Sequence, residues 1–98
     1  QGIMETPQNQ AGIIVYGTRW CGLSNRTRRF LDQHNIPYTF IDIDEDSEAR
    51  RYVQEVNHGF RSVPTLVFPD GSILVEPKTW ELERKIGIDA GAPRPGDY

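Results

Sequence analysis

The sequence predicts an α/β fold in which helices cover a four-stranded mixed sheet. Three observations lead to this prediction: a helical pattern separates two short apolar runs, a second helical pattern follows, and a turn dipeptide joins two further apolar runs. The expected element order is β-α-β-α-β-β-α. A chain of 98 residues is long enough for one hydrophobic core, and its 37% hydrophobic residues indicate a folded domain.

The first half of the chain has the pattern of a parallel crossover. Residues 13–16 are apolar, rich in β-branched side chains and followed by Gly17, which is typical of a buried strand. Apolar side chains at helical spacing begin at Leu23 and stop before Pro37, because the residue ahead of a proline avoids the helical region. Residues 38–42 then form the second strand. A helix between two neighbouring strands predicts a right-handed parallel connection.

The second half predicts a helix, a hairpin and a last helix. The acidic stretch 44–47 supplies capping side chains to a helical pattern that stops at Gly59. Residues 65–68 and 72–75 flank the turn dipeptide Asp70-Gly71, which indicates a hairpin. Thr79 is expected to cap the last helix. We expect residues 1–10 to be a disordered segment with a tag remnant, 11–87 to form the domain, and 88–98 to be a flexible tail.

Composition excludes several classes of protein. The net charge of −3, without a basic stripe, gives no reason to expect nucleic-acid binding. No run of 18 apolar residues exists to span a membrane, and no leader pattern is visible, so a cytoplasmic protein is expected. The single cysteine rules out an intramolecular disulfide and a four-cysteine metal site.

The single cysteine, Cys21, falls between the first strand and the first helix. Ligands meet parallel sheets at the carboxyl ends of strands, and a helix start presents free N–H groups that stabilise a thiolate. Arg19 and Arg26 are expected to add positive potential. The alternative is a buried structural thiol. A Cys–His hydrolase is not expected, because His34 and His58 fall far along the two helices from Cys21.

Two motifs carry a resemblance to a known family. Residues 16–24, Tyr-Gly-Thr-Arg-Trp-Cys-Gly-Leu-Ser, resemble the active-site turn of glutaredoxins. Residues 61–65, Arg-Ser-Val-Pro-Thr, resemble their second signature, in which the proline is cis. Residues 68–72 together with Glu76-Pro77 are most similar to the mycoredoxin branch. The likeness extends from about residue 13 to residue 87 and implies a thioredoxin-like (glutaredoxin) fold.

The resemblance implies thiol–disulfide exchange with Cys21 as the attacking thiol. It implies no tightly bound cofactor and no metal, but a low-molecular-weight thiol, mycothiol or glutathione, as co-substrate. The expected partners are that thiol and proteins carrying mixed disulfides, and the chain is expected to be a monomer. The active-site motif around Cys21 comprises Trp20, Gly22, Leu23 and Ser24. The residues expected to bind the substrate thiol are Thr18, Arg19, Arg61, Ser62, Val63 and Pro64.

Departures from the family pattern leave alternatives open. Ser24 replaces the resolving cysteine of dithiol members, which leaves a monothiol route, unless Ser24 marks a natural or engineered loss of that cysteine. It is expected either to hydrogen-bond the thiolate or to cap the helix. Cys-Gly-Leu-Ser also resembles the Cys-Gly-Phe-Ser class, which carries a [2Fe–2S] cluster between two subunits, but Thr18 replaces its lysine. A redox-inactive binding module is the third class.

The site for the glutathione carboxylate is also altered. Residues 74–78, Leu-Val-Glu-Pro-Lys, replace the glycine-glycine-acidic stretch that holds the γ-glutamyl group in ordinary glutaredoxins. Loss of those glycine amides removes an expected anion site. Mycothiol is therefore expected in preference to glutathione.

Overall fold

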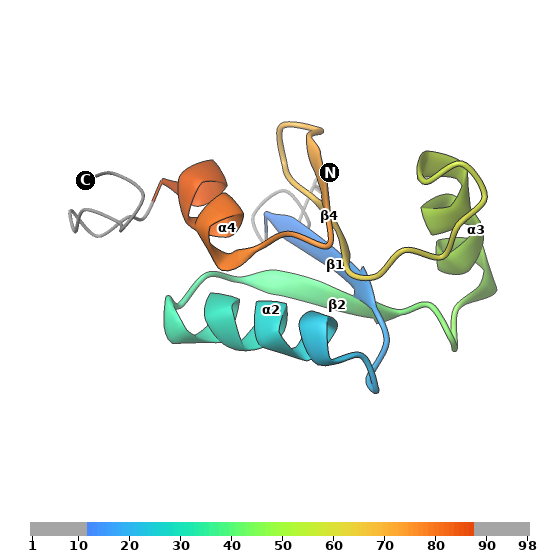
Figure 1. Cartoon of the computed structure of the whole chain (residues 1–98), viewed down its shortest axis with the longest axis horizontal. Coiled ribbons are helices and arrows are strands. Elements are labelled where there is room, and N and C mark those ends of the chain that lie inside the picture. The colour runs from blue at the N-terminus through green and yellow to red at the C-terminus, as the bar shows by residue number, and fades with distance from the viewer. Residues whose placement is uncertain (1–11, 88–98) are drawn as a thin grey trace, which may run out of the picture.

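The structure is a computed structural model that describes residues 12–87. The expectations for residues 1–10 and 88–98 fall outside this range. The element order is the predicted one (Figure 1). The bounds are β1 Ile13–Gly17, α2 Gly22–Gln33, β2 Tyr38–Asp42, α3 Ser47–Val56, β3 Thr65–Val67, β4 Ile73–Val75 and α4 Thr79–Ile86.

The four strands form one mixed sheet in the order β2-β1-β3-β4. Strands β1 and β2 are parallel, with Ile13 opposite Tyr38, so the predicted parallel connection through α2 is confirmed. Strand β3 runs antiparallel to β1, and β4 antiparallel to β3. The mixed α/β sheet predicted from the apolar runs is therefore confirmed.

The hairpin turn is longer than the sequence pattern suggested. Strand β3 stops at Val67 and β4 starts at Ile73, because residues 68–72 close on themselves. The N–H of Phe68 donates to the carbonyl of Ser72 at 2.9 Å, and Gly71 adopts a φ of +88° that favours glycine. The extra turn residues shorten both strands.

Two helix starts show how capping differs from expectation. At α3 the Asp46 carboxylate accepts from the N–H of Ala49 at 3.0 Å, as the acidic stretch predicted. At α4 the cap position belongs to Lys78, and Thr79 is already the first helical residue. The Glu81 carboxylate reaches back to the Lys78 N–H at 2.7 Å, so the expected Thr79 cap is wrong.

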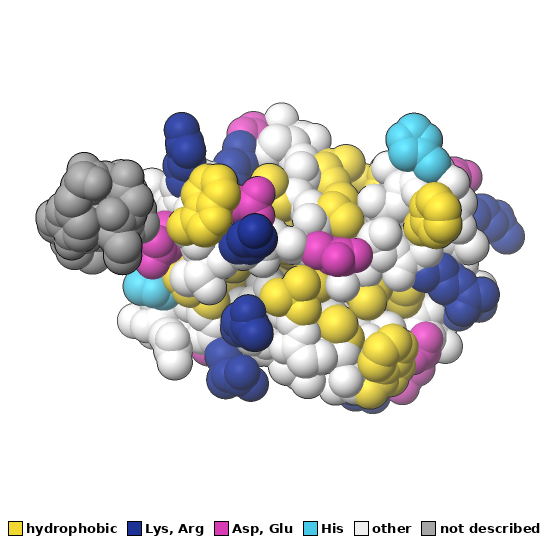
Figure 2. All heavy atoms as spheres, in the orientation of Figure 1, with side chains coloured by type: hydrophobic (Ala, Val, Ile, Leu, Met, Phe, Trp, Pro, Cys, Tyr) yellow, Lys and Arg dark blue, Asp and Glu magenta, His cyan; other side chains and the backbone are white. Residues whose placement is uncertain are grey.

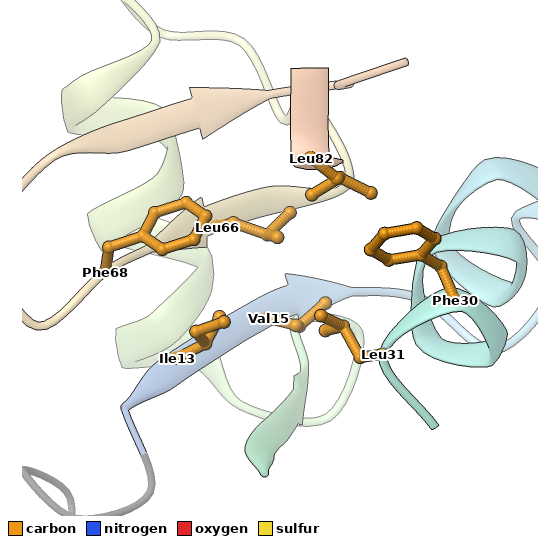
Figure 3. Close-up of a cluster of buried hydrophobic side chains, with 7 residues drawn as sticks. All are labelled: Ile13, Val15, Phe30, Leu31, Leu66, Phe68 and Leu82. Carbon is orange, nitrogen blue, oxygen red and sulfur yellow. The ribbon is translucent and has the colours of Figure 1, made fainter. Parts of the chain in front are cut away.

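The helices cover opposite faces of the sheet. One cluster of buried side chains joins α2 and α4 to one face of β1 and β3 (Figure 3); its members are Ile13, Val15, Phe30, Leu31, Leu66, Phe68 and Leu82. A second cluster joins Ile43 to Ala49 and Val53 of α3, with Tyr16 packed against it. Alternate residues of β1 thus contact different helices. Strand β1 is therefore fixed by helices on both faces of the sheet. The turn after its carboxyl end leads into the start of α2.

The surface carries mixed side chains. Figure 2 shows hydrophobic, basic and acidic side chains interspersed on one face. Three large aromatic side chains are well exposed, Trp20, Phe60 and Trp80. Within residues 12–87 no helix has both the length and the apolar character needed to cross a membrane.

Candidate active site

Cys21 occupies the N-cap position of α2. Strand β1 ends at Gly17, and a turn brings the Cys21 N–H 3.4 Å from the carbonyl of Thr18. Cys21 itself is extended, with φ −82° and ψ 121°, and its Sγ accepts a hydrogen bond from the N–H of Ser24 at 3.5 Å. An N-cap side chain normally satisfies one of the free amides in the first helical turn. Here the sulfur has that role, so the cap expected of Ser24 is supplied by Cys21.

These contacts make Cys21 more acidic than an ordinary cysteine. Burial opposes ionisation and raises the pKa of the thiol, and the carboxylate of Glu76 acts in the same direction. Hydrogen bonding from the Ser24 side chain and from the backbone N–H groups of Ser24 and Leu23 lowers the pKa and outweighs both. The thiolate is therefore more populated at a given pH than in an ordinary cysteine.

The hydroxyl of Ser24 lies within the first turn of α2, fully buried. Among residues 12–87 it makes no well-aligned hydrogen bond, which leaves its proton free to turn toward the sulfur. The space it occupies depends on Gly17: a β-carbon at that glycine would lie 2.7 Å from Ser24 Oγ. The end of β1 and the start of α2 are thus packed closely behind the cysteine.

A second segment faces the sulfur from across the fold. The Val63–Pro64 peptide bond is cis, as the resemblance implied, and Cys21 Sγ lies 3.9 Å from the carbonyl oxygen of Val63. Behind this segment the Thr65 hydroxyl donates to the carbonyl of Ser62 at 2.7 Å, and the Asn57 amide donates to Thr65 Oγ1 at 3.2 Å. Hydrogen bonds from β3 and from the end of α3 therefore hold the backbone opposite the thiol.

The two segments enclose an open hollow of about 420 Å³. Cys21 and several other residues of the two motifs line it. Its lining is Cys21, Leu23, Phe60, Arg61, Ser62, Val63 and Glu76. The two motifs, forty residues apart in the chain, thus meet at one place.

Three predicted binding residues do not line this hollow, and two of them, Thr18 and Arg19, lie shortly before Cys21 in the chain. Thr18 is buried, with only 2% of its surface exposed. The Arg19 guanidinium pairs with Glu45 at 3.0 Å and with Asp42 at 3.7 Å. Contact of either residue with a substrate thiol stays a prediction. The pKa of Cys21 is lowered by hydrogen bonds at the helix start, as expected, whereas the additional effect expected of Arg19 is not among its causes.

The remaining motif residues surround the thiol in different ways. Trp20 is 73% exposed, and its indole N–H donates to Asp44 at 2.8 Å, which fixes the ring beside the turn. Gly22 is exposed at the first position of α2. Pro64, the second residue of the cis peptide bond, is buried and does not line the hollow.

Sequence reasoning did not assign two of the lining residues to the site. Phe60 precedes the second motif directly, and only that position marks it. Glu76 was noted as a departure from the family pattern, without a role. Residues 12–87 contain no group of three or more His, Cys, Asp or Glu placed to share a metal ion.

Comparisons with known proteins agree with this geometry. The family profile for glutaredoxin matches residues 13–73. A protein of Mycobacterium tuberculosis named as a glutaredoxin is 38% identical over 81 residues, which is 83% of this chain and 96% of the relative. Mycoredoxin 1 of Corynebacterium glutamicum is 36% identical over 76 residues, covering 78% of this chain and 94% of that protein.

Solved structures share the same architecture. The glutaredoxin of Archaeoglobus fulgidus superposes with a TM-score of 0.64 at 27% identity, covering 87% of this chain and 98% of the other. A thioredoxin-like protein superposes with a TM-score of 0.65 at 26% identity, covering 74% of this chain and 96% of the other. The expected thioredoxin-like fold is confirmed.

Proposed function

Because the chain belongs to the glutaredoxin family, whose members are generally thiol oxidoreductases, we propose that it reduces mixed disulfides between proteins and a low-molecular-weight thiol. The proposal specifies a monothiol route through Cys21, the single cysteine of the chain. It also names mycothiol as the preferred small thiol. Mycoredoxin 1 is among the relatives, and the glycine pair that would hold a γ-glutamyl carboxylate is replaced by Val75-Glu76.

One observation carries the proposal: the sulfur of Cys21 lies in an open hollow between the first turn of α2 and the carbonyl of Val63. The N–H of Ser24 donates to Sγ from one side, and the Val63 carbonyl lies 3.9 Å from Sγ on the other. The helix start stabilises the thiolate. The backbone of Val63, a residue that lines the hollow, offers hydrogen-bonding groups to the amide portion of a small thiol, as a strand edge would.

The reaction needs two exchanges at Cys21. In the first, the Cys21 thiolate attacks the small-thiol sulfur of the mixed disulfide; the protein thiolate leaves and takes a proton from solvent. Cys21 then carries the small thiol as a disulfide. In the second, the thiolate of another small-thiol molecule attacks that adduct and releases the Cys21 thiolate. The substrate protein leaves as a thiol, and the small thiol it carried is joined to the second, now oxidised, small thiol in one disulfide.

Ser24 is compatible with this route because the second exchange uses an external thiol. A hydroxyl cannot form a disulfide with the Cys21 adduct, so the adduct persists until a small thiol arrives. The acidity of Cys21 assists both steps, first as attacking group and then as leaving group.

The experiment measures turnover of one protein mixed disulfide with mycothiol, glutathione and bacillithiol in parallel. We expect turnover with at least one of them, fastest with mycothiol, and none in the variant Cys21→Ser. Turnover fastest with glutathione would contradict the choice of thiol. Absence of turnover with all three would contradict the proposed function.

A further inference from the structure

The hollow beside Cys21 contains an unexpected carboxylate. Glu76 directly follows β4, is exposed, and lines the hollow together with Cys21 and Val63. Its N–H donates to the carbonyl of Pro64 at 2.8 Å, so its backbone is attached directly to the segment that faces the sulfur. Glu76 is therefore part of the wall against which a small thiol would lie, and its carboxylate is close enough to act on the Cys21 thiol.

The backbone conformation of Glu76 makes this placement specific. Its φ is +50°, in the left-handed region that side-chain-bearing residues other than Asn and Asp rarely adopt. Such conformations persist where the surrounding structure holds them, and they cluster at ligand-binding sites. Here the hydrogen bond to Pro64 and the buried Pro77 that follows hold the residue in place.

The charge of Glu76 is not neutralised by an ion pair within residues 12–87. The lining has one other charged residue, Arg61, on the segment leading to Val63, and it too forms no ion pair among the described residues. The Glu76 carboxylate raises the pKa of Cys21, against the larger effect of the helix-start hydrogen bonds, so its field reaches the sulfur. The same field acts on any charged group brought to that sulfur.

We propose that Glu76 selects the small thiol by charge, disfavouring thiols with a carboxylate at this wall and admitting uncharged ones. The inference deepens the proposed function and rests on it for the identity of the substrate. A sugar-linked thiol without a carboxylate fits such a wall, whereas glutathione, with two carboxylates, meets repulsion. Since the hollow is open to water, the expected discrimination is about three- to tenfold.

The first test compares two alkylating reagents that differ in charge. Iodoacetamide is neutral, iodoacetate is anionic, and both alkylate the Cys21 thiolate. We expect the ratio of the iodoacetamide rate to the iodoacetate rate to fall about three- to tenfold in Glu76→Gln, and further in Glu76→Lys. A changed acidity of Cys21 alters both rates equally, so it cancels in the ratio. Added salt should lower the ratio for the native chain and have less effect on Glu76→Gln.

Glu55→Gln is the matched control. Glu55 is an exposed carboxylate on α3 that does not line the hollow, so its removal changes the net charge equally. We expect its reagent ratio to equal that of the native chain. A ratio unchanged in Glu76→Gln, or shifted equally in Glu55→Gln, would overturn the proposal, because the carboxylate would then have no local effect.

The second test repeats the comparison with turnover of a protein mixed disulfide. We expect Glu76→Gln to raise the rate with glutathione, relative to the rate with mycothiol, about three- to tenfold. The alkylation test and the turnover test together separate the charge selection from the proposed function. If the reagent ratio shifts but no thiol supports turnover, the charge selection holds and the proposed function fails. If turnover occurs and both ratios stay unchanged, the proposed function holds and the charge selection is overturned.

Discussion

The backbone N–H of Ser24 lies 3.5 Å from Sγ of Cys21 and donates to it, so the cysteine caps its own helix. A sulfur in this position gains most when it is ionised, because a thiolate is a stronger acceptor than a thiol. The same hydrogen bond therefore caps α2 and stabilises the thiolate, which is the reactive form of the cysteine.

The first prediction concerns the acidity of Cys21. Because hydrogen bonds at the helix start outweigh burial and Glu76, the pKa of the thiol should lie below its value in the unfolded chain. The rate of alkylation by iodoacetamide against pH measures it, first in buffer and then in concentrated urea. An inflection in buffer as high as that in urea would show that the helix start does not stabilise the thiolate.

The same shift predicts how stability changes with pH. The native pKa is the lower one, so the unfolded state holds more protons between the two values, and the contribution of Cys21 to folding grows as pH rises through this window. This contribution is complete above the pKa that Cys21 has in the unfolded chain. It is lost as pH falls through the pKa that Cys21 has in the native chain. The difference in unfolding free energy between the native chain and Cys21→Ala should therefore increase over that window. A difference independent of pH would contradict the assignment.

The second prediction concerns the hydroxyl of Ser24. Ser24→Ala keeps the backbone N–H that donates to Sγ and removes only the side-chain contribution. A hydrogen bond to a charged group contributes about 1.5–3 kcal/mol, so the rate should fall by about a hundredfold at most, with a higher pKa for Cys21. Turnover of a mixed disulfide measures the rate, and the dependence of alkylation on pH measures the pKa of Cys21. A complete loss of turnover would mean that Ser24 takes part in the chemistry directly.

The third prediction concerns Ser24→Cys. Position 24 is one helical turn from Cys21 and is buried behind it, so the variant should close an intramolecular disulfide. It should gain activity on protein disulfides and lose some on mixed disulfides, because the second thiol diverts the adduct. Counting free thiols after mild oxidation tests the first point. If the native chain reduces no mixed disulfide while Ser24→Cys is fully active, Ser24 marks a disabled dithiol enzyme.

The fourth prediction concerns the packing behind the cysteine. In Gly17→Ala the new β-carbon would lie 2.7 Å from Ser24 Oγ and 3.2 Å from the Phe40 ring. Because the neighbouring groups must shift, we expect a loss of about 1–3 kcal/mol of unfolding free energy. The loss should be smaller in a Ser24→Ala background, since the nearest atom is then gone. Urea unfolding of the four proteins in this cycle measures the coupling.

Gly22→Ala is the matched control for that cycle. A β-carbon at Gly22, in the first turn of α2, meets nothing within 4 Å. Its stability should be unchanged or up to about 1 kcal/mol higher, because alanine favours the helix. If Gly17→Ala were as stable as Gly22→Ala, the close contact between β1 and α2 would not be needed.

Local sequence patterns predicted most of the fold because each helix and strand is marked by its own apolar spacing, capping residues or turn residues. Residues 38–42 were predicted as a strand and form one with those bounds, and Asp46 caps α3 as the acidic stretch indicated. The resemblance, rather than a local pattern, implied that Cys21 and Val63 belong to one site, as attacking thiol and thiol-binding residue. Their contact follows from the order of the sheet, in which β3 lies beside β1.

The rest of the site depends on contacts that no local pattern contains. Arg19 stands two residues before Cys21, yet its guanidinium pairs with Glu45, 26 residues along the chain. The helix start accounts for the acidity of the thiol as predicted, but the added effect that proximity in sequence suggested for Arg19 is not among the causes. Glu76 approaches Cys21 because β4 returns beside β3 and its backbone bonds to Pro64. Only the folded chain brings that carboxylate to the hollow.

The most direct test of the monothiol route is the identity of the first adduct on Cys21. Reduced protein is mixed with one equivalent of a protein–mycothiol mixed disulfide, the reaction is stopped with acid, and the intact mass is measured. We predict that the chain gains the mass of one mycothiol, that Cys21→Ser gains nothing, and that added mycothiol removes the adduct. An adduct with the substrate protein, or no adduct on Cys21, would contradict the account.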